Sequence, residues 1–221
     1  MPREAYPMLL VIAISAVATL FMVRGSRPLA RKGLRLAGLV IPLAVFPLWG
    51  SGAYRICNFL PAAALALLEA ARLSGGGGGS SLDRLISPIA KEGEGKGFSG
   101  LSTYFWGAAL ASLAPGGVGP AVTVMANLGD PWASMIGSAW GGRRSPLGKT
   151  WAGSAACLTA TAWAGSSFVM LFPGSGVTYL QAILASMAMT VVEGYSPGEY
   201  DNLLIQAAGA AAMILTARVF V

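Results

Sequence analysis

The stretch LGDPWASMIGSAWGGRRSPLGKTWAGS, residues 128–154, joins two apolar segments through a short polar turn. Asp130 lies inside the first segment and is followed directly by Pro131. The turn and the start of the second segment carry, in order, Gly141-Gly142, Arg143-Arg144 and Lys149-Thr150. Two apolar segments around a polar turn predict a pair of neighbouring helices. The carboxylate, the cations and the hydroxyl predict a site that holds a metal-bound polyphosphate beside a membrane.

The composition of the whole chain is that of a membrane protein. Of its 221 residues, 55% are hydrophobic and 11% are charged, and the mean hydropathy is +0.64. A soluble domain carries about 25% charged residues. The net charge of +6 would suggest nucleic acid in a soluble protein, but here the cations cluster in short loops between apolar runs. We therefore expect a single integral-membrane domain over residues 1–221 and no nucleic-acid partner.

Apolar runs divide the chain from end to end. Each run has about the length of a helix that crosses the ~30 Å hydrocarbon core. Only helices are expected, because backbone polar groups in lipid must bond within their own segment. The sequence predicts an all-α, polytopic membrane helix bundle of about eight transmembrane helices, with short links at 54–55 and 173–176. The runs are 7–23, 36–53, 56–71, 98–113, 118–140, 151–172, 177–192 and 203–221.

The distribution of Lys and Arg predicts the orientation of the helices. Three loops, 24–35, 72–97 and 141–150, hold twelve of the fifteen basic residues. Such loops remain in the cytoplasm, so both termini are expected outside and the candidate site faces the cytoplasm. The loop 72–97 includes a Gly/Ser-rich part, residues 74–81, which we expect to be flexible.

Asp130 is predicted to lie below the membrane surface. Residues 118–128 make roughly 16 Å of helix, about half of the hydrocarbon thickness. Pro131 removes a backbone donor and favours a helix break beside the carboxylate. An ionisable residue inside the membrane is costly and indicates a functional site. The alternative is a buried Asp that bonds the backbone of a neighbouring helix.

Two further charged stretches flank apolar runs. EGYSPGEYDN, residues 193–202, contains a Ser-Pro-Gly turn and then Asp201-Asn202 at the start of the last run. An Asp at a helix start can cap free backbone donors, so the residues alone leave capping and function equally open for Asp201. KEGEGKGFSG, residues 91–100, alternates charges with glycines, and its plain interpretation is a solvated loop.

Gly148-Lys149-Thr150 stands at a predicted helix start, where free N–H groups and the helix dipole favour an anion. The motif is not a P-loop, because the spacing from Gly142 to Gly148 is one residue too long and no strand precedes it. A membrane anchor is the alternative role for Lys149.

Together these patterns resemble the CTP-dependent lipid-alcohol kinases, the dolichol, phytol and diacylglycerol kinases that are related to the phosphatidate cytidylyltransferases. The resemblance covers roughly residues 91–205, together with the Arg31-Lys32 pair before the second apolar run. It rests on GD-x-x-A-x-x-x-G, the basic loop, GK-T-x-x-GS, the charged cluster 91–100, and Glu193 followed by Asp201-Asn202. This chain has Arg35 where many members of that family have His, Ser138 where others have Arg, and Ala152 where some have Glu.

The resemblance implies transfer of the γ-phosphate of CTP to the hydroxyl of a dolichol-type polyprenol at the cytoplasmic membrane face. The implied catalytic residues are Asp130, Asp201 and Lys149. The implied ligands of Mg²⁺ or another divalent cation are Asp130, Asp201 and Glu193. The implied nucleotide contacts are Glu94, Lys96, Arg143, Arg144, Lys149, Thr150 and Asn202. The expected partners are CTP, an isoprenoid alcohol or other lipid and membrane lipids, and a homodimer is one option.

Three alternative functions stay open from the sequence. A phytol or diacylglycerol kinase would differ only in the lipid. A cytidylyltransferase would make a CDP-lipid, but such enzymes carry a His-Gly-Gly block and this chain has no His. A small transporter or scaffold would explain intramembrane acids but not the basic loop or the Lys-Thr pair. Without His, the general base of a kinase must be a carboxylate or Lys.

Overall fold

The computed structural model describes residue 33 and residues 36–74, 98–145, 148–198 and 200–220. Within these ranges the chain is helical and forms no strand, which confirms the all-α prediction there. The elements are η1 (Ile41–Val45), α3 (Phe46–Ser74), α5 (Gly100–Ser112), α6 (Val118–Trp140), α7 (Trp151–Leu171), η3 (Pro173–Ser175), α8 (Tyr179–Tyr195) and α9 (Asp201–Phe220).

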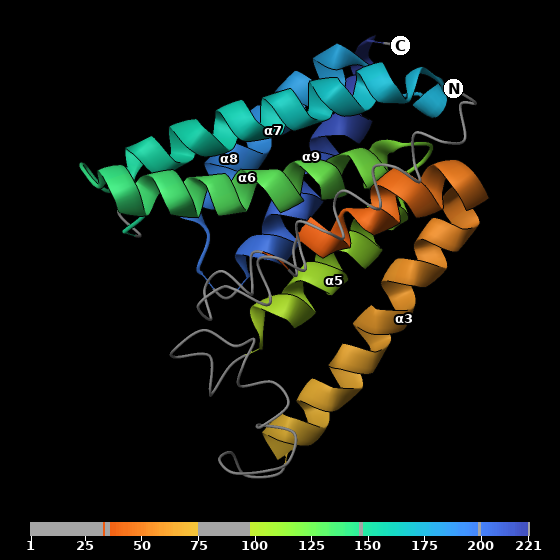
Figure 1. Cartoon of the computed structure of the whole chain (residues 1–221), viewed down its shortest axis with the longest axis horizontal. Coiled ribbons are helices and arrows are strands. Elements are labelled where there is room, and N and C mark those ends of the chain that lie inside the picture. The colour runs from red at the N-terminus through yellow and green to blue at the C-terminus, as the bar shows by residue number, and fades with distance from the viewer. Residues whose placement is uncertain (1–32, 34–35, 75–97, 146–147, 199, 221) are drawn as a thin grey trace.

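The helices form one bundle (Figure 1). α6 packs along α7, α8 packs against both α7 and α9, and α5 lies between α3 and α9. Short connections make the successive helices from α5 to α9 antiparallel, and Glu69 near the end of α3 contacts Ser99 at the start of α5. The C-terminal ends of α3, α6 and α8 therefore lie beside the N-terminal ends of α5, α7 and α9. We call this end of the bundle, which carries the charged side chains described below, the polar end.

Glycines allow the helices to approach closely on both sides of the bundle. A Cβ atom at Gly153 of α7 would lie 2.8 Å from the carbonyl oxygen of Ala133 in α6. A Cβ atom at Gly107 of α5 would lie 2.8 Å from the carbonyl oxygen of Asn202 in α9. Small residues at such contacts are typical of helices that pack in a membrane.

Hydrogen bonds between side chains cross the apolar core. Tyr54 of α3 and Thr123 of α6 share a hydrogen bond of 2.8 Å between hydroxyls, and Thr123 also lies 3.2 Å from the amide oxygen of Gln206 in α9. Gln206 in turn donates to the carbonyl oxygen of Tyr104 in α5 at 3.0 Å. All four side chains are buried. These contacts fix four helices relative to one another, because an unpaired polar group in the core would be costly.

Three helical segments of the described chain are long and apolar enough to cross a membrane: Leu36–Ser74, Trp151–Leu171 and Asp201–Val219. Large apolar side chains such as Trp163, Leu215 and Val219 are exposed on the outside of the bundle. Both findings indicate a membrane protein. α5 has 13 residues, about 20 Å of helix, and is shorter than the ~30 Å hydrocarbon core. The eight spans and the sides of the termini remain predictions, and the first expected span, 7–23, lies outside the described residues.

The break between the two expected spans 36–53 and 56–71 differs from the prediction. The sharp turn occurs at Gly50, whose φ of 78° and ψ of −175° are not helical, rather than at 54–55 (Figure 1). Glycine tolerates a positive φ, whereas residues with a Cβ rarely do. Tyr54 belongs to the helix and is buried against Thr123. α3 also continues to Ser74, three residues beyond the apolar run.

The expected helix break at Pro131 is wrong. α6 runs without interruption from Val118 to Trp140 with Pro131 inside it. An interior proline loses one hydrogen bond and costs about 3 kcal/mol in an isolated helix. Packing against neighbouring helices makes such prolines tolerable in membrane bundles, and α6 has α7 along its length.

Candidate functional site

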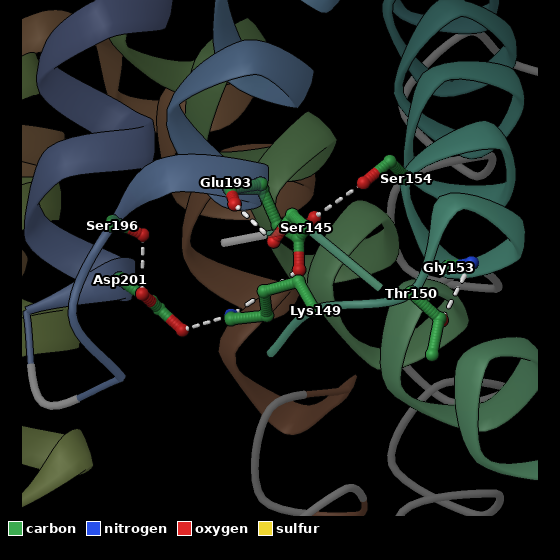
Figure 2. A network of polar contacts seen from close by, with 9 residues as sticks. Ser145, Lys149, Thr150, Gly153, Ser154, Glu193, Ser196 and Asp201 are labelled. Atoms are coloured by element: carbon green, nitrogen blue, oxygen red, sulfur yellow. Dashed lines mark hydrogen bonds and ion pairs between the residues drawn. The ribbon is translucent and has the colours of Figure 1, made fainter. Parts of the chain in front are cut away.

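Lys149 joins the ends of three helices at the polar end (Figure 2). Its ammonium donates to Asp201 Oδ2 at 2.5 Å and to Glu193 Oε1 at 3.3 Å. Lys149 precedes the N-cap of α7, Glu193 lies near the end of α8, and Asp201 is the first residue of α9. Both carboxylate residues are 4% exposed. The sequence therefore predicted three residues that the fold brings into direct contact.

Two opposing effects set the pKa of Lys149. Burial alone would lower the pKa, because the charged ammonium loses water. The hydrogen bond and charge of Asp201, together with those of Glu193, outweigh burial and raise the pKa above its usual value of 10.5. Lys149 is therefore a cation at neutral pH. With both carboxylates ionised, the three groups carry one net negative charge.

Serine hydroxyls hold the two carboxylates in place. Ser196, in the turn between α8 and α9, donates to Asp201 Oδ1. Ser154, in the first turn of α7, donates to Glu193 Oε2 at 3.4 Å. Ser145 donates to the carbonyl oxygen of Gly194 at 3.1 Å, which ties the basic loop to the end of α8. Each carboxylate thus has a hydroxyl partner in addition to Lys149.

The loop that carries Lys149 is closed by backbone hydrogen bonds. Arg144 and Thr150 form an antiparallel bridge, and the amide of Ser145 donates to the carbonyl oxygen of Lys149 at 2.6 Å. Gly141, Gly142 and Gly148 adopt positive φ angles of 59°, 91° and 82°. These glycines permit the sharp reversal after α6. The reversal returns the chain so that Lys149 faces α8 and α9.

Thr150 is the N-cap of α7. Its hydroxyl accepts from the amide of Gly153 at 3.1 Å. A Cβ atom at Gly137 of α6 would lie 2.5 Å from this hydroxyl oxygen, so α6 covers the cap closely. The predicted nucleotide contact by Thr150 therefore competes with a capping role that was not predicted from the sequence. The prediction that a helix begins directly after Lys149-Thr150 is confirmed.

Both arginines of the loop are exposed, and no ion pair to either is seen among the described residues. Arg143 and Arg144 are exposed, and the carbonyl oxygen of Arg143 accepts from the amide of Trp151 at 3.1 Å. Their backbone is held by the loop, and their guanidinium groups lie at the surface. They can therefore meet a phosphate that approaches Lys149 from the water side. That role remains a prediction.

Asn202 connects the site to α5. Its amide nitrogen donates to the carbonyl oxygen of Gly100, the first residue of α5, at 2.8 Å. Asn202 is 7% exposed, so little of the side chain is open to a ligand. The nucleotide contact of Asn202 remains a prediction. In the structure, the side chain of Asn202 joins the start of α9 to the start of α5.

Asp130 lies on the face of α6 that turns toward α5 and α9. Thr123 and Asn127 precede Asp130 by seven and three residues, which places the three residues on one helix face. Asn127 donates to the hydroxyl of Tyr104 in α5 at 2.9 Å. α5 runs antiparallel to α6, so Asp130 lies one turn nearer the polar end than Asn127, toward Gly100 and Asn202. Asp130 is half-buried.

The carboxylates of the polar end meet the needs of a divalent cation only in part. In the described ranges, no three His, Cys, Asp or Glu side chains gather as a metal site. Glu193 and Asp201 do converge on one point, which Lys149 occupies. Mg²⁺ prefers oxygen ligands and often takes only one or two carboxylates, with water and substrate phosphates completing its shell. The pair fits such an ion bound together with a nucleotide, and the membership of Asp130 in this set remains a prediction.

Two predicted nucleotide contacts, Glu94 and Lys96, lie outside the described residues. Their roles stay predictions, as do those of the rest of the cluster 91–97. The described chain resumes at Phe98, immediately before the cap of α5.

A second buried ion pair at the polar end was not predicted. Glu69 of α3 is fully buried, and its Oε2 accepts a hydrogen bond from Arg72 at 2.8 Å. Its Oε1 accepts from the amide of Ser99 and from the hydroxyl of Ser102, both at 2.9 Å. Ser99 is also the N-cap of α5. Glu69 thus fixes the start of α5 against α3. In the sequence, this ion pair could have been found from Glu69, an acid inside the apolar run 56–71 that lies three residues before Arg72.

The two charged groups are linked through the helix starts. Glu69 holds Ser99, Gly100 follows Ser99 and accepts from Asn202, and Asn202 follows Asp201, which binds Lys149. The polar end is thus one continuous network across α3, α5, α9 and the start of α7.

No known protein family, curated protein or solved structure matches this chain.

Proposed function

We propose that this chain is a CTP-dependent lipid-alcohol kinase that acts on a polyprenol of the dolichol type. The observation that carries the proposal is the contact of Lys149 with Glu193 and Asp201 at one end of an apolar helix bundle. A cation next to paired carboxylates is what phosphoryl transfer needs, since that reaction depends mainly on positioning and charge stabilisation. The sequence motifs supply the choice of CTP and of an alcohol.

Lys149 is suited to bind a phosphate oxygen. Its side chain is 25% exposed, so the ammonium can be reached from the water side while its stem remains buried. In the proposed complex Lys149 turns from the carboxylates to the β- or γ-phosphate, and Arg143 and Arg144 bind the outer oxygens. The helix dipole at the start of α7 also favours a phosphate at this position.

Glu193 and Asp201 would hold Mg²⁺, and the bound ion would neutralise part of the negative charge of the phosphates. Their hydroxyl partners Ser154 and Ser196 fix the orientation of the carboxylates. Release of Lys149 to the phosphates would leave two buried negative charges side by side. That repulsion favours the joint arrival of a cation and a nucleotide over the arrival of either alone.

Asp130 is the carboxylate proposed to accept the proton of the alcohol. It lies ten residues, about 15 Å, from the end of α6, and is therefore the acid nearest the apolar layer among these three. The alcohol oxygen forms a bond to the γ-phosphorus, the bond from that phosphorus to the β–γ bridging oxygen breaks, and CDP leaves. The proton of the alcohol passes to Asp130.

The test is incubation of purified protein with γ-labelled CTP or ATP, Mg²⁺, and separate polyprenol, phytol and diacylglycerol substrates. We expect label in a polyprenyl monophosphate and formation of CDP. The matched control is Asp201→Asn, which keeps the side-chain shape and should give no labelled lipid. A CDP-lipid with pyrophosphate would identify a cytidylyltransferase instead, and the absence of product with every pair would contradict the kinase proposal.

A further inference from the structure

An apolar pocket lies between α5 and α9, at the end of the bundle opposite the polar end. Its volume is about 740 Å³, within the range of roughly 300–1,000 Å³ that ligand pockets occupy. Its walls are formed largely by small residues of α9 and by two leucines at the end of α5, the second of them its C-cap: Ala207, Ala210, Ala211, Ala217, Leu110 and Leu113. The pocket thus has the size and lining for a hydrocarbon chain.

Arg218 provides a cation in the pocket lining. It lies 17 residues after Asp201 on α9, about 26 Å along the helix axis. This distance is close to the thickness of the hydrocarbon core. Arg218 is exposed, and within the described ranges no carboxylate forms an ion pair with it. The one other long polar side chain of the lining, Gln181, is already bonded to the carbonyl oxygen of Met213 at 3.0 Å.

The surface around the pocket is apolar. Leu110 and Leu113 of the lining are 50% and 56% exposed. In a membrane these side chains contact lipid tails, so the pocket opens where lipid chains are present. Closure of α5 against α9 at Gly107 separates the pocket from the site at the polar end.

We propose that this pocket binds an anionic glycerophospholipid, with one acyl chain against the alanines of α9 and the phosphate on Arg218. Basic groups between transmembrane helices recognise lipid head groups in this way, and Arg matches phosphate geometry with two parallel hydrogen bonds. The site is separate from the proposed kinase site and does not depend on it. The competing explanation is that Arg218 only anchors the end of α9 at the surface, which would not discriminate between lipids.

The test uses the purified full-length chain in detergent, with dioleoyl phosphatidylglycerol and dioleoyl phosphatidylcholine added separately and bound lipid counted by native mass spectrometry. The unaltered protein should bind phosphatidylglycerol more tightly. Loss of one charge-assisted contact changes affinity on the order of tenfold, so Arg218→Gln should weaken phosphatidylglycerol binding by that factor. Phosphatidylcholine binding should fall less, because the choline ammonium of that lipid already offsets the charge of its phosphate. Arg143→Gln, which removes an exposed cation at the polar end, is the matched control and should keep the preference.

A second variant tests the pocket itself. Ala211 is exposed and lines the pocket, so Ala211→Leu should fill part of the volume without disturbing buried packing. We expect it to weaken binding of phosphatidylglycerol while the thermal midpoint of the lipid-free protein stays within the error of the measurement. The proposal would be overturned if the unaltered protein bound the two lipids equally, or if Arg218→Gln kept the preference for phosphatidylglycerol. It would also be overturned if Ala211→Leu bound phosphatidylglycerol as tightly as the unaltered protein while its thermal midpoint was unchanged.

Discussion

Lys149 stands between two carboxylates that would repel each other without it. Removing one partner of a buried ion pair costs about 3–5 kcal/mol, and the partial exposure of Lys149 reduces this to on the order of 2 kcal/mol. Lys149→Ala should therefore lower the thermal midpoint and raise the KM for CTP. Lys149→Arg should recover most of the stability but only part of the turnover, because a planar fork does not replace a point charge.

The measurement for Lys149 combines thermal unfolding in detergent with steady-state kinetics. Arg144→Ala, which removes an exposed cation of the same loop, is the control for a general effect of charge and should leave the thermal midpoint unchanged. If Lys149→Ala kept both the midpoint and the KM, Lys149 would be an anchor and not part of a site.

Asp130 and Asp201 come from different helices, yet we expect them to act as one unit. Asp130→Asn and Asp201→Asn should each lower kcat by at least about a hundredfold, and the double variant should be no worse than either single one, as for other groups that act together. The amide keeps the hydrogen-bond shape, so both variants should extract and fold normally by gel filtration. Multiplicative losses in the double variant would show two independent roles.

At the level of single residues, the sequence identified the charged groups of the polar end but not which of them contact one another. Glu193, Lys149 and Asp201 were all expected at the cytoplasmic side because of the loops that contain them. Their direct pairing depends on the antiparallel packing of α7, α8 and α9, which local sequence does not encode. Glu69 was missed because its partner Ser99 lies 30 residues away, beyond the segment 75–97.

The contact of α5 with α9 depends on the absence of a side chain at Gly107. A Cβ atom at this position would meet the carbonyl oxygen of Asn202 at 2.8 Å and Leu203 Cα at 3.0 Å. Backbone atoms cannot move aside independently, so Gly107→Ala should cost about 1–3 kcal/mol, typical of overpacking. The shift of α9 should also lower turnover, because Asp201 begins that helix.

Gly52→Ala is the matched control for Gly107→Ala. Gly52 lies within α3, and a Cβ atom there has nothing within 4 Å. Alanine is favoured over glycine inside a helix by roughly 0.5–1 kcal/mol, so this variant should be as stable as the parent or slightly more stable. Thermal unfolding followed by tryptophan fluorescence compares the two. Equal midpoints would show that α5 and α9 are packed less tightly than the structure indicates.

At the level of elements, helix ends beside polar loops were the most predictable feature. The expected run 118–140 coincides with α6, and α7 begins where Lys149-Thr150 predicted a helix start. The bend at Gly50 was misplaced because the polar pair 54–55 looked like a link, whereas Tyr54 finds a buried partner on α6. The predicted helix break at Pro131 was wrong because the prediction considered only the local cost of a proline in a helix and not the packing of α7 against α6.

For the whole molecule, the orientation in the membrane is the main prediction. In a variant without native cysteines, Ser145→Cys lies at the polar end and Gly174→Cys lies at the opposite end, in η3. A membrane-impermeant thiol reagent added to intact cells should label the cysteine at position 174 and not the one at 145, because basic loops remain in the cytoplasm. The reverse pattern would invert the orientation, and labelling of both would show that the polar end is open to the outside.

The short length of α5 has a consequence for the surrounding bilayer. At about 20 Å, this helix is roughly 10 Å shorter than the hydrocarbon core of a bilayer. Such a mismatch is relieved when the lipid layer thins locally or when neighbouring helices tilt. If α5 crosses the membrane as predicted, water would reach farther toward the bilayer midplane next to α5 than elsewhere on the protein surface. A lipid head group at this position would sit in a dimple of the membrane, level with Gly100 and Asn202, and would meet a water-soluble reagent there without being lifted out of the lipid layer.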